Sequence, residues 1–370
     1  MGTLYDYLKW RGDISFEEVP VNDVDSLIFS QLSYIDYKWI VPPAHQGSSI
    51  PIQAAANSFF AKHPNPKDIY MGVLLPKGLI TLLKAVKDTR RFRNVEMRAY
   101  VNVIDTKKET QFSATTFLIN PNSMMIAYRG TDDTLVGWKE DLNMSFLPVV
   151  PAQRYAAQYL NEAAQNFSGE IRITGHSKGG NLAVYAAVHS NPSVKKMIKR
   201  VWCLDGPGFN QGFLHSAEYL KLRPLIRSFV PQAAFVGILL DHEDNYTVVK
   251  SRQTGVFQHD ALSWSVLGSS LVTVKETTKR SQRNDQNLNN WIGQMTPKQR
   301  EQFVEALYQI FSSDNATTLT DLVSFRKNKW LQKSAGLDPH VKKTVLRTLA
   351  LYMESQKGGL LSSVFKKKEP

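Results

Sequence analysis

A serine between two glycines stands where a strand-forming segment gives way to a helix-forming one. The pentapeptide Gly175-His176-Ser177-Lys178-Gly179 follows the strand-forming segment IRIT and precedes GNLAVYAA. Gly-x-Ser-x-Gly in this setting is typical of a nucleophile elbow, a sharp turn that exposes a serine hydroxyl at the top of a sheet. Small residues are needed there because the turn brings the strand and helix backbones close together. The pattern alone is short, and its position between strand and helix makes Ser177 the candidate nucleophile.

A serine hydroxyl is a poor nucleophile until a base removes its proton, and the base needs an acid to orient it. Of the eight histidines, His259 follows the last predicted strand and comes after Ser177, in the chain order that this arrangement requires. His259 is therefore the candidate base. His176 adjoins the serine, and we expect its side chain to point elsewhere. Three others are expected in a helix or on the surface: His189, His215 and His340.

The elements around these residues divide the chain into three regions. The sequence pattern of residues 1–95 predicts a mainly helical N-terminal part packed on the core. The pattern of residues 285–370 predicts a helical C-terminal extension or cap. Between them, residues 96–270 alternate strands with helices. This alternation predicts an α/β fold with a mostly parallel central sheet flanked by helices, whose ligands sit at the carboxyl ends of the strands.

Local patterns place the elements of this core. Strands are predicted over residues 97–105, 111–120, 123–130, 171–177, 199–205 and 227–232, and helices over 152–167 and 179–190. Helices are also predicted near 79–86, after Thr296 as N-cap with Pro297 at the first helical position, and over 340–359.

Composition excludes several classes of protein. The chain is 42% apolar and 21% charged, as in soluble globular proteins, and no apolar run is long enough to span a membrane. The N-terminus lacks the basic and apolar regions of a secretory signal. The single cysteine, Cys203, allows no intramolecular disulfide. A cytoplasmic protein without cofactor is expected.

The acidic run Asp241-His242-Glu243-Asp244 invites a metal-site interpretation. Consecutive residues seldom converge on one ion, so no metal is expected.

The formal charge of +12 is spread over the sequence rather than gathered in one motif. It predicts a solvated basic surface, with weak association with an anionic membrane surface such as the inner membrane as an alternative. No nucleic-acid module is present, and no nucleic-acid partner is expected. The sequence does not predict an oligomeric state.

Three segments, taken together, resemble the class 3 (fungal-type) lipases of the α/β-hydrolase fold. They are YRGTDD from Tyr128, WKEDL from Trp138, and GHSKGG from Gly175. The segment DGPGF from Asp205, and VVKS followed by QHD, make the chain still more similar to a bacterial lipase-like family, over about residues 25–265. Each segment is weak alone, and the combination is specific.

The resemblance implies an oxyanion hole. Thr131 would supply a backbone amide, with its hydroxyl as a further candidate donor, and Lys178 would supply the amide that follows the nucleophile. Asp141 and Trp138 are expected to hold the loop that carries Thr131. Lys178 replaces the apolar residue common in lipases, and its side chain either adds positive charge near the mouth of the site or faces solvent.

The triad acid is where the sequence departs from the class 3 pattern. Those lipases carry the acid on the strand that corresponds to residues 229–234, where this chain has alanine. Asp205, which ends the strand after the elbow, resembles the acid of pancreatic-type lipases and is the favoured candidate. Asp241 or Asp244 is the alternative acid, and a site without an acid partner is also open.

The function predicted from these residues is a serine esterase or lipase-like hydrolase. Ser177 would attack a small-molecule or lipid ester with a hydrophobic acyl group, His259 would act as base, and Asp205 would orient it. A thioesterase or peptidase with the same triad is the alternative enzyme, and nothing in the sequence excludes either. A non-catalytic binding protein of the same fold at a membrane surface is the alternative from another class. The terminal helices could line an acyl pocket or form a lid.

Overall fold

A mixed α/β architecture is seen in the computed structural model, which describes residues 1–65, 69, 76, 78–233, 246–278, 295–312, 316–321 and 339. Its centre is a nine-stranded sheet in the order β1-β2-β3-β4-β5-β6-β7-β8-β11. The strands are β1 (Ile50–Pro51), β2 (Glu96–Asp105), β3 (Thr110–Asn120), β4 (Ser123–Tyr128), β5 (Glu170–His176), β6 (Ile198–Leu204), β7 (Ile226–Pro231), β8 (Tyr246–Val249) and β11 (Thr273–Val274). A separate two-stranded hairpin is formed by β9 (Val266–Leu267) and β10 (Ser270–Leu271), which come between β8 and β11 in the sequence.

The sheet is parallel from β4 through β8 and antiparallel at both edges. Parallel strands end at the same edge of a sheet, so the segments that follow β4, β5 and β6 are brought together. These segments carry Thr131, Ser177 and Asp205. The predicted α/β fold is confirmed, and the antiparallel edge strands complete it.

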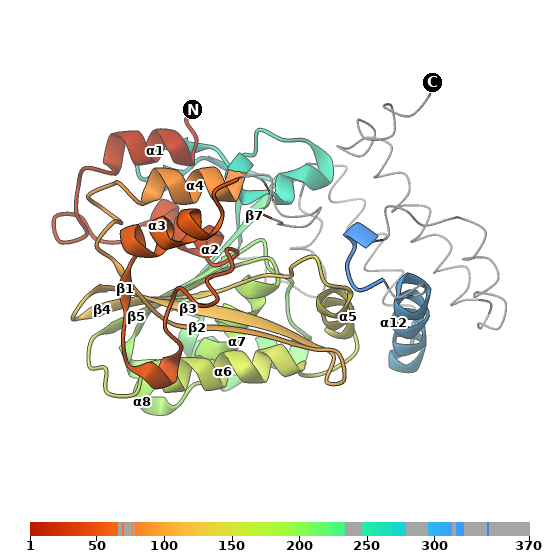
Figure 1. The fold of residues 1–370 in the computed structure, drawn as a ribbon. Helices are drawn as coiled ribbons and strands as arrows, with labels where there is room; N and C mark the ends of the chain where they lie inside the picture. Colours follow the sequence, from red (N-terminus) through yellow and green to blue (C-terminus); the bar gives the residue numbers. More distant parts are fainter. Residues whose placement is uncertain are drawn as a thin grey trace, which may run out of the picture.

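Helices cover both faces of the sheet (Figure 1). On one face lie α1 (Leu4–Arg11), α2 (Asp23–Leu32), α3 (Ile52–Lys62) and α4 (Gly78–Val86). On the other lie α6 (Pro151–Ala163), α7 (Lys178–His189) and α8 (Pro192–Met197). Shorter helices are α9 (Gln211–Leu214), α10 (Ala217–Leu222) and the 3₁₀ turns Ala44–Gln46, Arg223–Leu225, Gly255–His259 and Ala261–Ser263. The helices α5 (Leu135–Asn143) and α12 (Pro297–Phe311) pack on each other at one end of the sheet.

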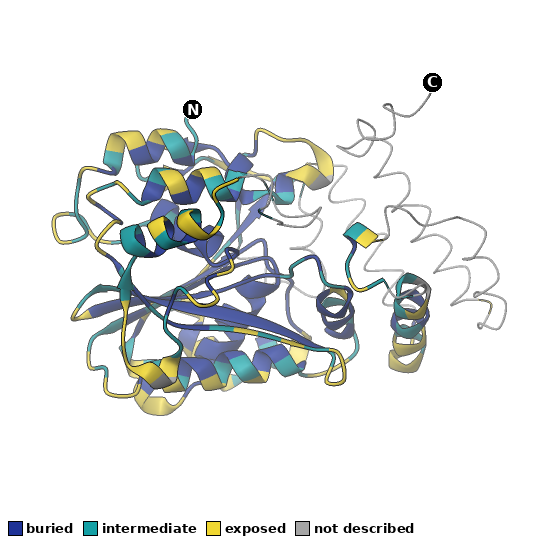
Figure 2. Cartoon of the chain, in the orientation of Figure 1, coloured by how far each residue is buried: buried dark blue, intermediate teal, exposed yellow. Residues whose placement is uncertain are grey.

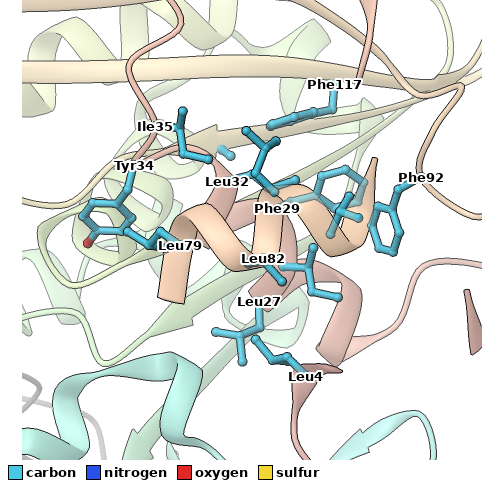
Figure 3. Close-up of a cluster of buried hydrophobic side chains, with 14 of the residues drawn as sticks. Leu4, Leu27, Phe29, Leu32, Tyr34, Ile35, Leu79, Leu82, Phe92 and Phe117 are labelled. Atoms are coloured by element: carbon cyan, nitrogen blue, oxygen red, sulfur yellow. The ribbon is translucent and has the colours of Figure 1, made fainter. Parts of the chain in front are cut away.

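The N-terminal helices share a hydrophobic core with the sheet. Helix α2 packs on β4, β5 and β6, and Figure 3 shows Phe29 and Leu32 of this helix beside Phe117 of β3 and Leu82 of α4. A second core lies between the opposite face and α6 and α7. Both faces of the central strands are therefore buried, while the outer faces of the helices are exposed (Figure 2).

A buried ion pair ties the N-terminal region together. Arg91 lies 2.5 Å from Asp25, with both side chains fully buried, and it also donates to the carbonyl oxygens of Val19 and Pro20. The Tyr7 hydroxyl donates to the same Asp25 carboxylate at 2.7 Å. Such a pair stabilises a fold only while both charges are present, because either alone would be an uncompensated buried charge.

Helix α12 begins as its sequence predicts. The Thr296 side chain accepts from the backbone of Gln299, and Pro297 occupies the first turn. Phe303 and Leu307 are buried, and Leu142 and Phe146 pack against their cluster. The helix predicted over 340–359 lies outside the described residues, and the three region boundaries remain predictions. Within the described residues, no helix has the length and hydrophobicity needed to cross a membrane.

Candidate active site

Ser177 occupies a strained turn between β5 and α7. Its φ of 57° and ψ of −135° are a backbone conformation that non-glycine residues rarely adopt and that persists only when surrounding contacts enforce it. The Ser177 amide donates to the carbonyl of Leu204 at the end of the neighbouring strand β6, at 2.9 Å. The turn is thus anchored by the sheet itself.

The two glycines of the pattern are required by close backbone contacts. A Cβ atom on Gly175 would lie 2.0 Å from the carbonyl oxygen of Gly179, and one on Gly179 would lie 2.2 Å from the carbonyl oxygen of Tyr128. Side chains at either position would collide with backbone that cannot move away easily. The sequence spacing therefore has a steric cause in the elbow.

Asp205 and His259 are in contact. Asp205 is fully buried directly after β6, and its Oδ2 lies 2.6 Å from Nδ1 of His259. An ionised carboxylate only accepts, so Nδ1 carries the proton and leaves the Nε2 lone pair of a neutral imidazole free. His259 ends a 3₁₀ turn, Gly255–His259, and its side chain is 29% exposed.

The His259 ring lies against the elbow. Its centroid is 4.6 Å from that of His176, the residue that precedes Ser177. The Ser177 hydroxyl makes no hydrogen bond to His259 in the described part of the chain, and contacts of this kind often tighten only in the substrate complex. The arrangement brings the candidate nucleophile, the candidate base and the buried candidate acid together at one edge of the sheet.

The strand end that carries the acid in class 3 lipases has a different role. The backbone amide of Ala233 donates to the side-chain oxygen of Gln258 at 2.7 Å. The Gln258 amide in turn donates to the carbonyl of Gln253. A neutral amide thus links this strand end to the loop before His259. The alternative acids Asp241 and Asp244 lie outside the described residues.

The loop between β4 and α5 packs against the elbow. A Cβ atom on Gly130 would lie 3.0 Å from the Cβ of Ser177. Next in the loop, the Thr131 hydroxyl donates to the Asp141 carboxylate. A hydroxyl has one hydrogen to donate, so this contact leaves the Thr131 backbone amide as the donor available to a substrate. The Lys178 amide is the first of α7 and is one of the four that have no acceptor within a helix.

Comparison with known proteins identifies the family of the chain. A family model described as Mbeg1-like matches residues 86–309, which is more than half of the chain. The chain belongs to the Mbeg1-like family. This family is lipase-like and points to a lipase-like hydrolase, while the class 3 assignment stays a prediction.

One solved structure is similar over part of the chain. It is described as the crystal structure of M37 lipase, is 14% identical, and is matched over 58% of this chain and 68% of that chain with a TM-score of 0.34. A comparison with curated proteins found no match.

The side chain of Lys178 lies in neither of its two expected places. It is fully buried, and its Nζ atom donates to the carbonyl of Gln111 at 2.9 Å and to Glu140 Oε2 at 3.0 Å. Nζ also lies 3.7 Å from Oδ1 of Asp141. Both sequence-based alternatives, a charge at the mouth and a solvent-facing side chain, were wrong. The ammonium points back into the protein, where the fully buried Glu140 carboxylate and the partly exposed Asp141 carboxylate lie near it.

The carboxyl group of Asp141 has an unusual pKa. Burial is the main cause that raises its pKa to about 6, and the neighbouring Lys178 ammonium and the Thr131 hydrogen bond oppose that rise. The contact between Asp141 and Thr131 agrees with the predicted role of Asp141 in holding this loop. Trp138 is 38% exposed, and its role in holding the loop stays a prediction.

His176 also differs from expectation. Its Nε2 atom lies 2.9 Å from the carbonyl oxygen of His259, and its Nδ1 lies 3.0 Å from the hydroxyl of Tyr34. The side chain points toward the candidate base rather than away from it. Tyr34, which comes from the N-terminal region and which the sequence did not single out, therefore reaches the elbow.

Metal binding has no visible basis in the described residues. No group of three or more histidine, cysteine, aspartate or glutamate side chains is placed there to hold an ion. Cys203 is buried and free, and burial raises the pKa of its thiol to about 12.

Proposed function

We propose that the protein is a serine hydrolase that cleaves carboxylic esters with hydrophobic acyl groups. The observation that carries the proposal is the 2.6 Å contact between His259 and the buried Asp205, beside a Ser177 held in a strained turn. Stored backbone strain and a buried acid–imidazole pair are features that active sites use.

The proposed first step forms an acyl-enzyme. Ser177 Oγ attacks the ester carbonyl carbon while its proton passes to Nε2 of His259. Negative charge develops on the carbonyl oxygen and is stabilised by the backbone amides of Thr131 and Lys178. When the tetrahedral intermediate collapses, the bond from carbon to the alcohol oxygen breaks, and His259 gives its proton to the departing alcohol.

Hydrolysis of the acyl-enzyme uses the same groups in reverse order. Water gives a proton to His259 and its oxygen bonds to the acyl carbon. The bond to Ser177 Oγ then breaks, the serine recovers its proton, and the carboxylic acid leaves. Throughout, Asp205 accepts from Nδ1 and stabilises the imidazolium that forms in each half-reaction.

The test is covalent labelling with a fluorophosphonate probe and turnover of p-nitrophenyl esters of several chain lengths. We expect wild type to be labelled and Ser177→Ala to lose both labelling and turnover. Ser190→Ala is the matched control, since Ser190 is buried at the end of the same helix and its hydroxyl donates to the Ala187 carbonyl. Full activity in purified Ser177→Ala would contradict the proposal.

Acyl-CoA and peptide substrates tested in parallel distinguish an esterase from a thioesterase or a peptidase with the same triad. A folded wild-type protein that is not labelled would favour a non-catalytic binding role.

Weak association with an anionic membrane rests only on the formal charge of +12. Sedimentation with anionic liposomes at low and high salt tests it, because such attraction is screened by salt.

A further inference from the structure

A lysine with a fully buried side chain directly follows the candidate nucleophile. Lys178 and its partner Glu140 both have 0% side-chain exposure. Burying two charges costs free energy that their attraction recovers only when geometry and hydrogen bonding are good. The mechanism above uses only the backbone amide of Lys178 and leaves its ammonium without a function.

The Glu140 carboxylate connects several elements at this point. Its Oε1 accepts from the Ala152 amide at the start of α6, at 2.8 Å, and its Oε2 accepts from the Gln111 amide of β3, at 2.9 Å. Lys178 adds α7 to these contacts through Oε2 and through the Gln111 carbonyl. The pair therefore joins β3, α5, α6 and α7.

Helix α5 also holds the loop between β4 and α5, which carries Thr131. Asp141, the residue after Glu140, accepts from the Thr131 hydroxyl and lies 3.7 Å from the Lys178 ammonium. A continuous set of contacts thus runs from the Lys178 backbone, through its side chain, to α5 and back to Thr131. Its two ends are the two amides assigned to the oxyanion hole.

We propose that the Lys178 side chain is a positioning residue that fixes the Thr131 amide relative to the nucleophile elbow, by holding Glu140 and Asp141 with one buried ammonium. The inference rests on the proposed serine-hydrolase function. Oxyanion donors act only when they are within hydrogen-bond distance of the developing charge, so a small displacement of α5 lowers the rate of the chemical step more than it weakens substrate binding.

The first variant is Lys178→Met, which keeps an unbranched side chain and removes the charge. We expect kcat per probe-titrated site to fall about 10- to 100-fold with KM changed less than about threefold. The inhibition constant of a boronic acid, which forms a tetrahedral adduct with the serine, should rise by a similar factor. A population of misfolded enzyme would lower total activity without changing that inhibition constant.

Lys139→Met is the matched control. Lys139 is in the same helix α5, is buried, and pairs with Glu109 and Glu305, but its ammonium makes none of these contacts with the elbow. We expect its kcat per titrated site and boronate inhibition to match wild type, even where its unfolding midpoint falls. A loss equal to that of Lys178→Met would overturn the inference, because general damage to α5 would then explain both.

A second variant covers the case in which Lys178→Met does not fold. Lys178→Met combined with Glu140→Gln removes both buried charges and keeps an oxygen acceptor for a backbone amide. We expect this protein to fold, to be labelled at Ser177, and still to bind the boronic acid about 10-fold or more weakly. Wild-type kcat and wild-type boronate inhibition in this variant would overturn the inference. If wild-type protein shows no turnover that depends on Ser177, the proposed function itself is wrong.

Discussion

His176 Nε2 lies 2.9 Å from the carbonyl oxygen of His259, so the residue before the candidate nucleophile holds the backbone of the candidate base. A carbonyl oxygen can only accept, which places the proton on Nε2 and leaves Nδ1 to accept from the Tyr34 hydroxyl. Burial, with a contribution from the neighbouring His259, holds the pKa of His176 well below its usual 6.5. The ring is therefore neutral when it holds His259.

Replacing His176 tests this support. We expect His176→Phe, which keeps a ring and loses both hydrogen bonds, to lower kcat about 10-fold or more because His259 is no longer fixed. His176→Gln retains an N–H donor and should recover part of the loss. His189→Phe, at an exposed residue in the helix after the elbow whose ring lies against Tyr185, is the control. Steady-state kinetics measure kcat for each variant. Equal kcat in His176→Phe and wild type would refute the role of His176 in holding His259.

The acid of the triad can be identified by comparing two neighbouring carboxylates. Asp205→Asn should lower kcat and the labelling rate about 10³- to 10⁴-fold, because an amide favours the wrong imidazole tautomer. Asp260→Asn is the control, since Asp260 adjoins His259 in sequence and its Oδ1 accepts from the Leu262 amide instead. Comparable losses in the two variants would argue against Asp205 as the specific partner.

Asp141 should make stability depend on pH. An acid whose pKa is raised on folding, here from 3.8 to about 6, binds its proton more tightly in the folded state. Its contribution is fully present below the unfolded value and is lost as pH rises through the folded value. Asp141→Asn removes this loss, so we expect the variant to gain stability relative to wild type between about pH 4 and about pH 7.

Urea unfolding across that pH range measures the effect. Asp13→Asn, which replaces an exposed carboxylate, is the control. The difference between its free energy of unfolding and that of wild type should stay constant across this pH range. Parallel curves for Asp141→Asn and wild type would show that Asp141 does not titrate in the expected window.

The buried pair in the N-terminal region gives a prediction about the fold. Arg91→Met leaves Asp25 buried without its cation, and we expect the free energy of unfolding to fall by about 3–5 kcal/mol. Arg90→Met, which breaks an exposed pair with Glu18, should cost about 1 kcal/mol or less. Chemical denaturation compares them, and similar losses would mean that burial adds nothing to this ion pair.

The elbow and the core strands could be predicted because their signals are local. Gly175, Gly179 and the change from strand to helix pattern describe a turn whose steric requirements act within a few residues. Asp205 could be proposed because it ends the strand after the elbow, and parallel neighbours end at the same edge of a sheet.

Contacts between distant segments gave no local signal. Lys178 is 38 residues from Glu140, and Tyr34 is 142 residues from His176. A lysine is normally a surface residue, so its burial follows only from a carboxylate that folding brings to it. The direction of the His176 ring likewise depends on the position of the His259 carbonyl, which the sequence does not specify.

The shared core of the N-terminal helices also affects the order in which the molecule is made. Leu4, Leu27 and Phe29 leave the ribosome well before Trp264 and Leu271, which belong to the same buried cluster. At about 5–20 residues per second, this cluster is completed on the order of ten seconds or more after its first members emerge. During that interval the nascent chain exposes apolar helix faces, and we expect it to be a chaperone client until the strands after Ser177 have been synthesised.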